Sequence, residues 1–291
     1  MSRKHPIISV AGSSGAGTTT VRHTFEQIFR REEITAAFID GDAFHRYDRQ
    51  EMQKLMAEAE ANGDKNLSHF GPETNLLQEL EAVFREYGER GTGRTRYYIH
   101  DHEEAELRGA PAGTFTPWEP LPENTEILFY EGLHGAVITP KVNLVRHADM
   151  RIGVVPVINL EWIQKVHRDR SLRGHSVEAV MDAILRRMPD YVHYICPQFT
   201  QTDINFQRVP TVDTSNPFTA KWIPTPDESM VVIRFRDPRG IDFAYLKTMI
   251  EDSFMSRANS IVIPGGKLDL AMQLILTPMI IRLVETRRRV S

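Results

Sequence analysis

Cysteine is nearly absent from this sequence of 291 residues, since Cys196 is the only one. A single cysteine excludes a disulfide within the chain and a zinc site built on cysteines. Long apolar runs are also missing: no stretch approaches the length that crosses a membrane, and the amino-terminal MSRKHPIISV lacks the apolar segment of a signal peptide. We therefore expect a cytoplasmic protein with no membrane partner.

An excess of positive charge is missing as well, because 35 basic residues face 39 acidic ones and leave a net charge of −4. We therefore expect no nucleic-acid partner, and any anion site must come from a local cluster of basic residues. With 41% hydrophobic residues the chain can bury a sizeable core. No long linker or internal repeat interrupts it, which predicts a single domain over residues 1–291.

Short apolar stretches alternate with helical patterns along the chain. Apolar runs predict buried strands at residues 6–12, 36–40, 125–132, 150–159 and 228–237. Apolar residues at helical spacing predict helices at residues 19–31, 50–61, 72–87, 160–188, 241–255 and 267–286, with a break near Arg173 and Gly174. This alternation predicts an α/β fold with a mostly parallel central sheet and helices on both faces.

A glycine-rich segment after the first predicted strand has the outline of a phosphate-binding P-loop, G-x-x-x-x-G-K-[ST]. Its residues are Gly12, Ser13, Ser14, Gly15, Ala16, Gly17, Thr18 and Thr19. A strand before and a helix after are the context in which backbone N–H groups surround a nucleotide phosphate, and Thr19 has the place of the magnesium-binding hydroxyl. A turn that binds nothing is the alternative. Thr18 stands at the lysine position, so the phosphates need a cation from elsewhere.

The segment KVHRDRSLRGHSVE, residues 165–178, can supply that cation. Helical spacing brings Lys165, Arg168 and Asp169 to one face of a helix. The break at Arg173 and Gly174 is typical of a mobile lid over phosphates. A solvated helix face with ion pairs is the alternative.

Two acidic residues lie where strands are predicted to end, and ligands bind beyond the carboxyl ends of parallel strands. Asp42, in DGDAFHRYDR, could accept a proton from an alcohol, while His45 and Arg49 could hold a phosphate on the substrate. An ordinary helix start with Asp42 as its N-cap is the alternative. Glu131, at the end of ILFYEG, has the position of a Walker B carboxylate that binds magnesium.

Together these segments resemble the phosphoribulokinase family. The pattern over residues 165–178, K-x-x-R-D-x-x-x-R-G-x-S-x-E, is similar to the signature of that family. GSSGAGTTT, GDAFHR, FYEGLHG, VVPVINLEWIQK and TDINFQRVPTVDTSNPF extend the resemblance over nearly the whole chain. Length and motif spacing resemble the bacterial class of this family, and in the family the P-loop itself lacks lysine. The resemblance implies a P-loop kinase fold with Lys165 as the substitute cation.

The resemblance implies ATP-dependent phosphorylation of D-ribulose 5-phosphate to ribulose 1,5-bisphosphate, the carbon-dioxide acceptor of the Calvin cycle, with ATP and Mg²⁺. Asp42 would be the catalytic base and Asp169 a second essential carboxylate. Thr19, Glu131 and Asp42 would be the candidate magnesium ligands. Spacing leaves open which of Asp42 and Asp169 is the base, and Asp42 is preferred for its place at a strand end.

The resemblance also divides the basic residues between two ligands. His45, Arg49 and Arg173 would bind the sugar phosphate. Lys165 and Arg168 would face the nucleotide and the moving phosphoryl group. Such an arrangement suits phosphoryl transfer, which depends on positioning and charge neutralisation.

The segment YYIHDH contains further candidates for the sugar pocket, Tyr98 and His100. A zinc site at His100 and His102 is the alternative, but no third ligand is evident. Two other functions also remain: a related P-loop kinase acting on a nucleoside or pantothenate, and a GTP-binding switch. The nearest match to the guanine-binding N-K-x-D is GGKLD, residues 265–269, which lacks the asparagine.

Regulation by metabolites is a further implication of the bacterial class, together with a homo-oligomer. NADH would activate the enzyme and AMP would inhibit it. Arg234, Arg236 and Arg257 are candidates for the effector site because they add positive charge outside the motifs, although surface salt bridges explain them equally well. The intrachain dithiol switch of plant-type relatives is excluded, since Cys196 has no partner cysteine.

Overall fold

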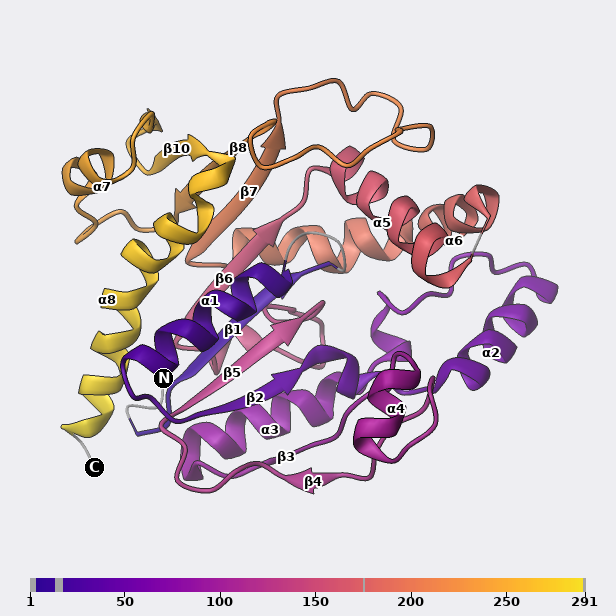
Figure 1. The fold of residues 1–291 in the computed structure, drawn as a ribbon. Coiled ribbons are helices and arrows are strands. Elements are labelled where there is room, and N and C mark those ends of the chain that lie inside the picture. The colour runs from indigo at the N-terminus through magenta and orange to yellow at the C-terminus, as the bar shows by residue number, and fades with distance from the viewer. Residues whose placement is uncertain (1–3, 14–17, 175, 290–291) are drawn as a thin grey trace.

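A computed structural model describes residues 4–13, 18–174 and 176–289, and one large sheet runs through them (Figure 1). Its strands lie in the order β2-β5-β1-β6-β7-β8-β10-β9. They span β1 Ile7–Gly12, β2 Ala36–Asp40, β5 Ile127–Gly132, β6 Met150–Val155, β7 Ile204–Pro210, β8 Ser229–Phe235, β9 Phe254–Arg257 and β10 Ser260–Pro264. A separate ribbon pairs β3 Arg94–Thr95 with β4 Glu119–Pro120.

Helices lie on both faces of this sheet. They are α1 Thr18–Arg31, α2 Arg49–Ala61, α3 Leu77–Arg90, α4 His102–Arg108, α5 Ile158–Arg173, α6 Val177–Asp190, α7 Phe243–Met249 and α8 Leu268–Arg288. Short 3-10 turns span Gly41–Phe44, Pro72–Thr74, Leu144–Arg146, Cys196–Thr200 and Gly265–Lys267, and a π-helical turn spans Tyr191–Ile195. Among the described helices, none is long and apolar enough to cross a membrane.

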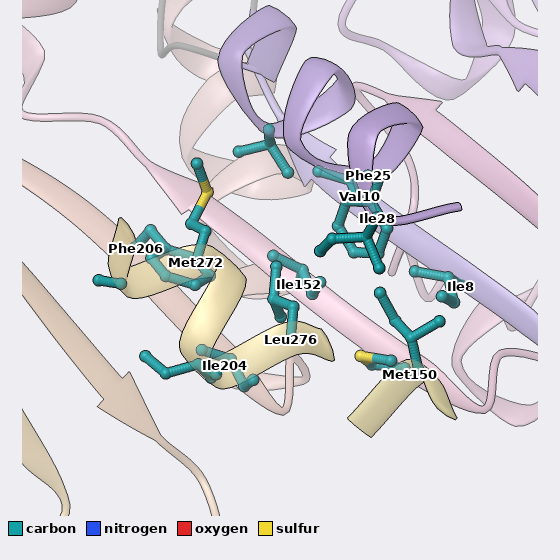
Figure 2. Packing of buried hydrophobic residues seen from close by; sticks show 14 of the residues in the cluster. Ile8, Val10, Phe25, Ile28, Met150, Ile152, Ile204, Phe206, Met272 and Leu276 are labelled. Carbon is teal, nitrogen blue, oxygen red and sulfur yellow. The ribbon is translucent and has the colours of Figure 1, made fainter. Parts of the chain in front are cut away.

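The central strands β1 and β5 are mostly apolar because both faces of the sheet are covered there. In β5, Ile127 and Phe129 point into the core beneath α1 and α8, whereas Leu128 and Tyr130 point into the core beneath α3. Figure 2 shows the first of these cores, in which side chains of α1 and α8 meet around Ile152 of β6.

The predicted α/β architecture is confirmed. Parallel pairing joins β2, β5, β1, β6 and β7, and the sheet then continues with the antiparallel strands β8, β10 and β9. The predicted break in the helical segment 160–188 is also present: α5 ends at Arg173, Gly174 has a left-handed backbone with φ 68°, and α6 begins at Val177.

Several predicted boundaries were wrong. The helix expected from residue 72 begins at Leu77, because Asn75 is extended and its side-chain amide donates to the carbonyls of His69 and Gly71. The helix expected over residues 241–255 ends at Met249, and the chain turns through Asp252, with φ 62°, into the edge strand β9.

Strands β7, β9 and β10 were not predicted. In β7, the polar residues Gln207 and Arg208 interrupt the apolar run that marks a buried strand. β9 has only four residues, mostly exposed, and β10 has only five. The pairing of β10 with β8, and of β9 with β10, is a tertiary property that such short runs do not reveal.

Two glycines allow the carboxyl ends of β2 and β5 to approach closely. A Cβ atom on Gly132 would lie 2.6 Å from the Cα atom of Gly41, and a Cβ on Gly41 would lie 2.7 Å from the Cα atom of Gly132. Both distances are shorter than carbon atoms tolerate, and the neighbouring atom is backbone. The approach therefore requires glycine at both positions and fixes the backbone next to Asp42.

We predict that Gly132→Ala destabilises the fold by about 1–3 kcal/mol, because the added methyl group must push the two strand ends apart. Urea unfolding measures this change. Gly266→Ala is the matched control, since the nearest atom to its new Cβ is the side-chain oxygen of Asp227 at 3.2 Å. Equal unfolding free energies for the two variants would contradict the close-approach argument.

Candidate active site

The predicted motifs converge at one edge of the sheet. Gly12 pairs with Val154 at the end of β6, and both Val10 and Asp40 pair with Glu131 near the end of β5. One edge of the sheet therefore carries all the motifs. The P-loop segment, the Asp42 segment and α5 follow β1, β2 and β6, and Glu131 lies near the end of β5. This is where ligands bind in open parallel sheets.

Asp42 and His45 form an ion pair just beyond β2. His45 Nε2 lies 3.1 Å from Asp42 Oδ1, and His45 Nδ1 lies 2.9 Å from Asn75 Oδ1. Because the Asn75 amide nitrogen donates to two backbone carbonyls, its oxygen is the atom that faces the imidazole. Both ring nitrogens of His45 thus face acceptors, an arrangement that a doubly protonated, positively charged imidazole satisfies.

The Asp42 carboxylate is held in its charged form by this partner. Burial alone would raise the pKa of Asp42, but the charge and hydrogen bond of His45 outweigh it and keep the pKa well below the usual range. Burial would lower the pKa of His45, and the Asp42 charge raises it instead. Asp42 nevertheless keeps 35% of its side chain exposed, so a substrate can reach it.

Three of the predicted sugar-binding residues gather around Asp42. His100 Nε2 lies 3.5 Å from Asp42 Oδ2, and the ring of Tyr98 lies 5.0 Å from that of His100. Arg49 Nη2 donates to the His100 backbone carbonyl at 2.8 Å. The side chain of Arg173 lies outside the described residues, so its role stays a prediction.

Arg96 stabilises the backbone of the turn that contains Asp42 and His45. The sequence motifs did not indicate this role of Arg96. Its guanidinium donates from Nε to the Ala43 carbonyl at 2.8 Å and from Nη2 to the His45 carbonyl at 2.6 Å. The guanidinium also lies over the rings of Phe115 and Trp118, whose centroids are 3.6 and 4.8 Å away. Arg96 therefore fixes the turn on which Asp42 and His45 sit.

Three carboxyl groups crowd the ends of β2 and β5. Burial and the negative charge of Asp42 raise the pKa of Asp40 to about 7, and Glu131 adds to the effect. Asp40 also accepts a hydrogen bond from the Asp42 backbone N–H at 2.9 Å. The sequence analysis overlooked Asp40, although it is the last residue of a predicted strand and lies two positions before Asp42.

Magnesium fits this chemistry, because a divalent cation would relieve the repulsion between Asp40, Asp42 and Glu131. Among the described residues, no group of three or more acidic, histidine or cysteine residues has the arrangement of a complete metal site. Magnesium usually keeps several waters and substrate phosphates as ligands, so one or two carboxylates suffice.

Lys165, Arg168 and Asp169 form one cluster on α5. Lys165 Nζ lies 2.5 Å from Asp169 Oδ2, and Arg168 Nε lies 3.0 Å from Asp169 Oδ1. Lys165 and Asp169 are buried, which argues against the alternative of a solvated helix face. Burial and the charge of Arg187 lower the pKa of Lys165 to about 8. Burial would raise the pKa of Asp169, but Lys165 lowers it.

The P-loop segment is tied to α5 at its first described serine. The buried Ser13 hydroxyl donates to Glu161 Oε1 at 2.7 Å, and the Tyr191 hydroxyl donates to Glu161 Oε2 at 3.3 Å. Burial raises the pKa of Glu161. The sequence analysis overlooked Glu161, which lies one helical turn before Lys165, so their spacing on one helix face was an available signal.

Part of the predicted P-loop cannot be placed. Ser14, Gly15, Ala16 and Gly17 lie outside the described residues, as do the side chains of Thr18 and Thr19. The backbone of Thr18 and Thr19 opens α1, as the strand–loop–helix pattern requires. Nucleotide binding by this segment, and magnesium binding by Thr19, stay predictions.

The candidate effector arginines fall into two places. Arg234 on β8 and Arg257 on β9 both pair with Ser260 of β10, so these exposed side chains flank one position of the sheet. Arg236, also exposed, follows β8 and donates to the Gln201 carbonyl at 3.2 Å. Arg234 and Arg257 are therefore neighbours across one strand, and Arg236 is separate from them.

Comparisons with known proteins agree with this geometry. The model of the phosphoribulokinase / uridine kinase family matches residues 7–215. A phosphoribulokinase of Nitrobacter vulgaris is 71% identical over 289 residues, covering 99% of this chain and 100% of the relative. One from Sinorhizobium medicae is 64% identical over the full length of both chains.

A solved structure extends the likeness to three dimensions. The phosphoribulokinase from Rhodobacter spheroides superposes with a TM-score of 0.91 at 63% identity, covering 99% of this chain and 100% of that one. The chain matches these relatives from end to end, and it belongs to the phosphoribulokinase / uridine kinase family of kinases.

Proposed function

We propose that this kinase uses ATP and Mg²⁺ to phosphorylate D-ribulose 5-phosphate, forming ribulose 1,5-bisphosphate for carbon fixation. The observation that carries the proposal is the cluster around Asp42: an ionised, accessible carboxylate bordered by two histidines, with Arg49 beside it. This cluster suits an acceptor that has both a hydroxyl to be activated and a phosphate to be bound. A nucleoside or pantothenate offers no such phosphate.

Asp42 is the better candidate for the base. Its side chain is 35% exposed, whereas that of Asp169 is 5% exposed and has a cation on each carboxylate oxygen. We propose that Asp42 accepts the proton of the attacking hydroxyl. Asp169 holds Lys165 and Arg168 in position. Ion pairing to His45 keeps Asp42 deprotonated and ready to accept that proton.

Lys165 and Arg168 neutralise charge on the phosphoryl group as it moves, in the role that the P-loop lysine has in other NTPases. The Ser13–Glu161 hydrogen bond places their helix against the start of the P-loop segment, which supports this assignment. Bound Mg²⁺ supplies charge neutralisation at the phosphates, with Thr19, Glu131 and Asp42 as its candidate ligands. Residues 165–178 form the lid in this proposal, within one domain over residues 1–291.

The sugar phosphate is assigned to Arg49 and Arg173 as direct donors, with Tyr98 and His100 lining the pocket. His45, whose two ring nitrogens face Asp42 and Asn75, is assigned to the same phosphate through its positive charge. Arg49 is exposed and held by one hydrogen bond to a carbonyl, so its guanidinium keeps donors for a phosphate. We further propose a cytoplasmic homo-oligomer that is activated by NADH and inhibited by AMP. Arg234 and Arg257 are neighbours on either side of β10, which supports the binding of an anionic effector beside them.

A turnover assay tests the proposed function directly. We expect ADP formation with ATP and ribulose 5-phosphate, and none above background with uridine or pantothenate as acceptor. Replacing ATP with GTP should lower the rate. Turnover with a non-phosphorylated acceptor at a comparable rate would reject the proposal.

Asp42→Asn should lower kcat by about two to four orders of magnitude, because it removes a positioned base. Nucleotide affinity should change little. Steady-state kinetics and ATP binding measure the two effects, and Asp227→Asn, in the turn before β8, is the control. A variant that keeps a tenth of the original turnover would exclude Asp42 as the base.

Arg49→Ala and His45→Ala should raise KM for ribulose 5-phosphate more than KM for ATP. Arg49→Ala removes a charge-assisted contact worth roughly 1.5–3 kcal/mol, or about ten- to hundredfold in KM, and His45→Ala removes the positive charge beside the pocket. Initial-rate kinetics with each substrate varied in turn provide the measurement. If KM for ATP rises instead, these residues belong to the nucleotide half of the site.

The pKa of Lys165 gives a pH prediction. Since burial lowers this pKa to about 8, Lys165 is charged below that pH and loses its charge as pH rises through it. We expect kcat/KM for ATP to fall on the alkaline side of pH 8 in the unmodified enzyme. In Lys165→Arg, whose guanidinium stays charged, that decline should vanish, whatever the absolute rate. An unchanged alkaline limb in the variant would refute the role of Lys165.

Regulation should be independent of thiol chemistry. We expect equal activity in oxidised and reduced dithiothreitol, and a rise in activity on adding NADH that Arg234→Ala and Arg257→Ala weaken. A coupling of about 1–3 kcal/mol, or 5- to 150-fold, is the usual range. Reversible loss of activity on oxidation that is absent in Cys196→Ser would contradict this account.

A further inference from the structure

A cavity of about 700 Å³ lies between α7, α8 and the adjoining ends of β7 and β8. Its size falls in the range of small-molecule binding sites. Apolar side chains form much of its lining, among them Phe235, Leu246, Leu274 and Met279. Three arginines also line it: Arg239, which pairs with Asp237, and Arg236 and Arg282. No role in the proposed reaction falls to any of them.

The acidic residues along this cavity are already engaged. Asp203 pairs with Arg151, at 2.6 Å between Oδ1 and Nη2, and Asp237 pairs with Arg239 at 2.5 Å. Asp242 accepts a hydrogen bond from the backbone N–H of residue 245 at 2.9 Å, as the N-cap of α7. These carboxylates therefore have partners other than Arg236 and Arg282.

The positive charges of Arg236 and Arg282 are not neutralised in the same way. Arg236 donates to the Gln201 carbonyl, a neutral acceptor. Within the part of the chain that the structure describes, neither Arg236 nor Arg282 forms an ion pair. The cavity thus combines an apolar lining with two guanidinium groups that can still bind an anion.

We propose that this cavity binds a small amphipathic organic anion. Its apolar body packs against Phe235, Leu246 and Met279, and its phosphate, sulfonate or carboxylate group accepts hydrogen bonds from Arg236 and Arg282. An inorganic anion would leave the apolar lining unused. A neutral apolar molecule would leave the arginines unused.

The site is separate from the catalytic cluster. It lies where β7 begins and β8 ends, whereas the catalytic residues follow the carboxyl ends of the parallel strands. Figure 1 shows α7 and α8 on the left of the molecule, with α2 and α4 on the right. Arg234 is also excluded from it, because Ile233 and Phe235 face α8 and the intervening side chain points to the other face of β8.

Helix α8 connects the cavity to α1, the helix that follows the P-loop segment. Leu274 and Met279 line the cavity. On another side of α8, Gln273 Oε1 and Thr277 Oγ1 accept hydrogen bonds from Arg31 of α1, at 2.8 and 2.9 Å. A ligand in the cavity would therefore contact the helix that supports α1.

Fluorescence titration of the full chain with anilinonaphthalene sulfonate, an amphipathic anion, tests this site. ATP and Mg²⁺ are kept saturating so that the dye cannot occupy the nucleotide site. We expect one dye per chain, and at least tenfold weaker binding of the neutral analogue N-phenylnaphthylamine. The double variant Arg236→Ala/Arg282→Ala should weaken dye binding at least tenfold and leave binding of the neutral analogue unchanged.

Arg85→Ala is the matched control, since it removes an exposed arginine of α3 that does not line the cavity. It should bind the dye as the unmodified chain does. Met279→Trp fills the cavity and should abolish dye binding with both arginines intact. The arginine variants change exposed side chains, so the test holds even if Met279→Trp unfolds. Equal affinity in the double variant and the control, or several weak dye sites per chain, would overturn the proposal.

Discussion

Crowded negative charge at the carboxyl ends of β2 and β5 is the constraint on which the rest of the site depends. The glycines at the two strand ends let the backbones nearly touch, so Asp40, Asp42 and Glu131 share a small volume. Three ionised carboxylates so close repel one another strongly. The protein relieves the repulsion by raising the pKa of Asp40 to about 7 and by pairing Asp42 with a charged histidine. Added magnesium would relieve it further.

The same constraint explains why Asp42 can be ionised and accessible at once. A buried carboxylate normally gains a proton, but His45 prevents this because both of its nitrogens are held, one by Asp42 and one by Asn75. Arg96 then fixes the turn from the outer side through two backbone carbonyls. The base is therefore in position before the substrate binds. Phosphoryl transfer is faster when the reacting groups are positioned in advance.

The sequence predicted the positions of the motifs better than it predicted their partners. Asp42, Glu131 and Lys165 were assigned to one sheet edge because strand ends and helical spacing are local patterns. In the structure Asp42 follows β2, Glu131 lies near the end of β5, and α5, which carries Lys165, follows β6. Asn75 and Arg96 were missed because each acts on residues 30 to 53 positions away, which no periodicity records. Thirty residues of intervening chain can take many paths, and only the folded core selects one.

Local and long-range determinants also differ on α5. The spacing of Lys165 and Asp169 made their pairing predictable, but the burial that lowers the pKa of Lys165 comes from the packing of α5 against its neighbours. Val166 on α5 packs with Val180 and Ile184 of α6. Because the left-handed Gly174 separates these two helices, the charge cluster depends on how the second helix folds back. A change at the Gly174 break would therefore reach Lys165 through the packing of α6, without altering any residue of the cluster.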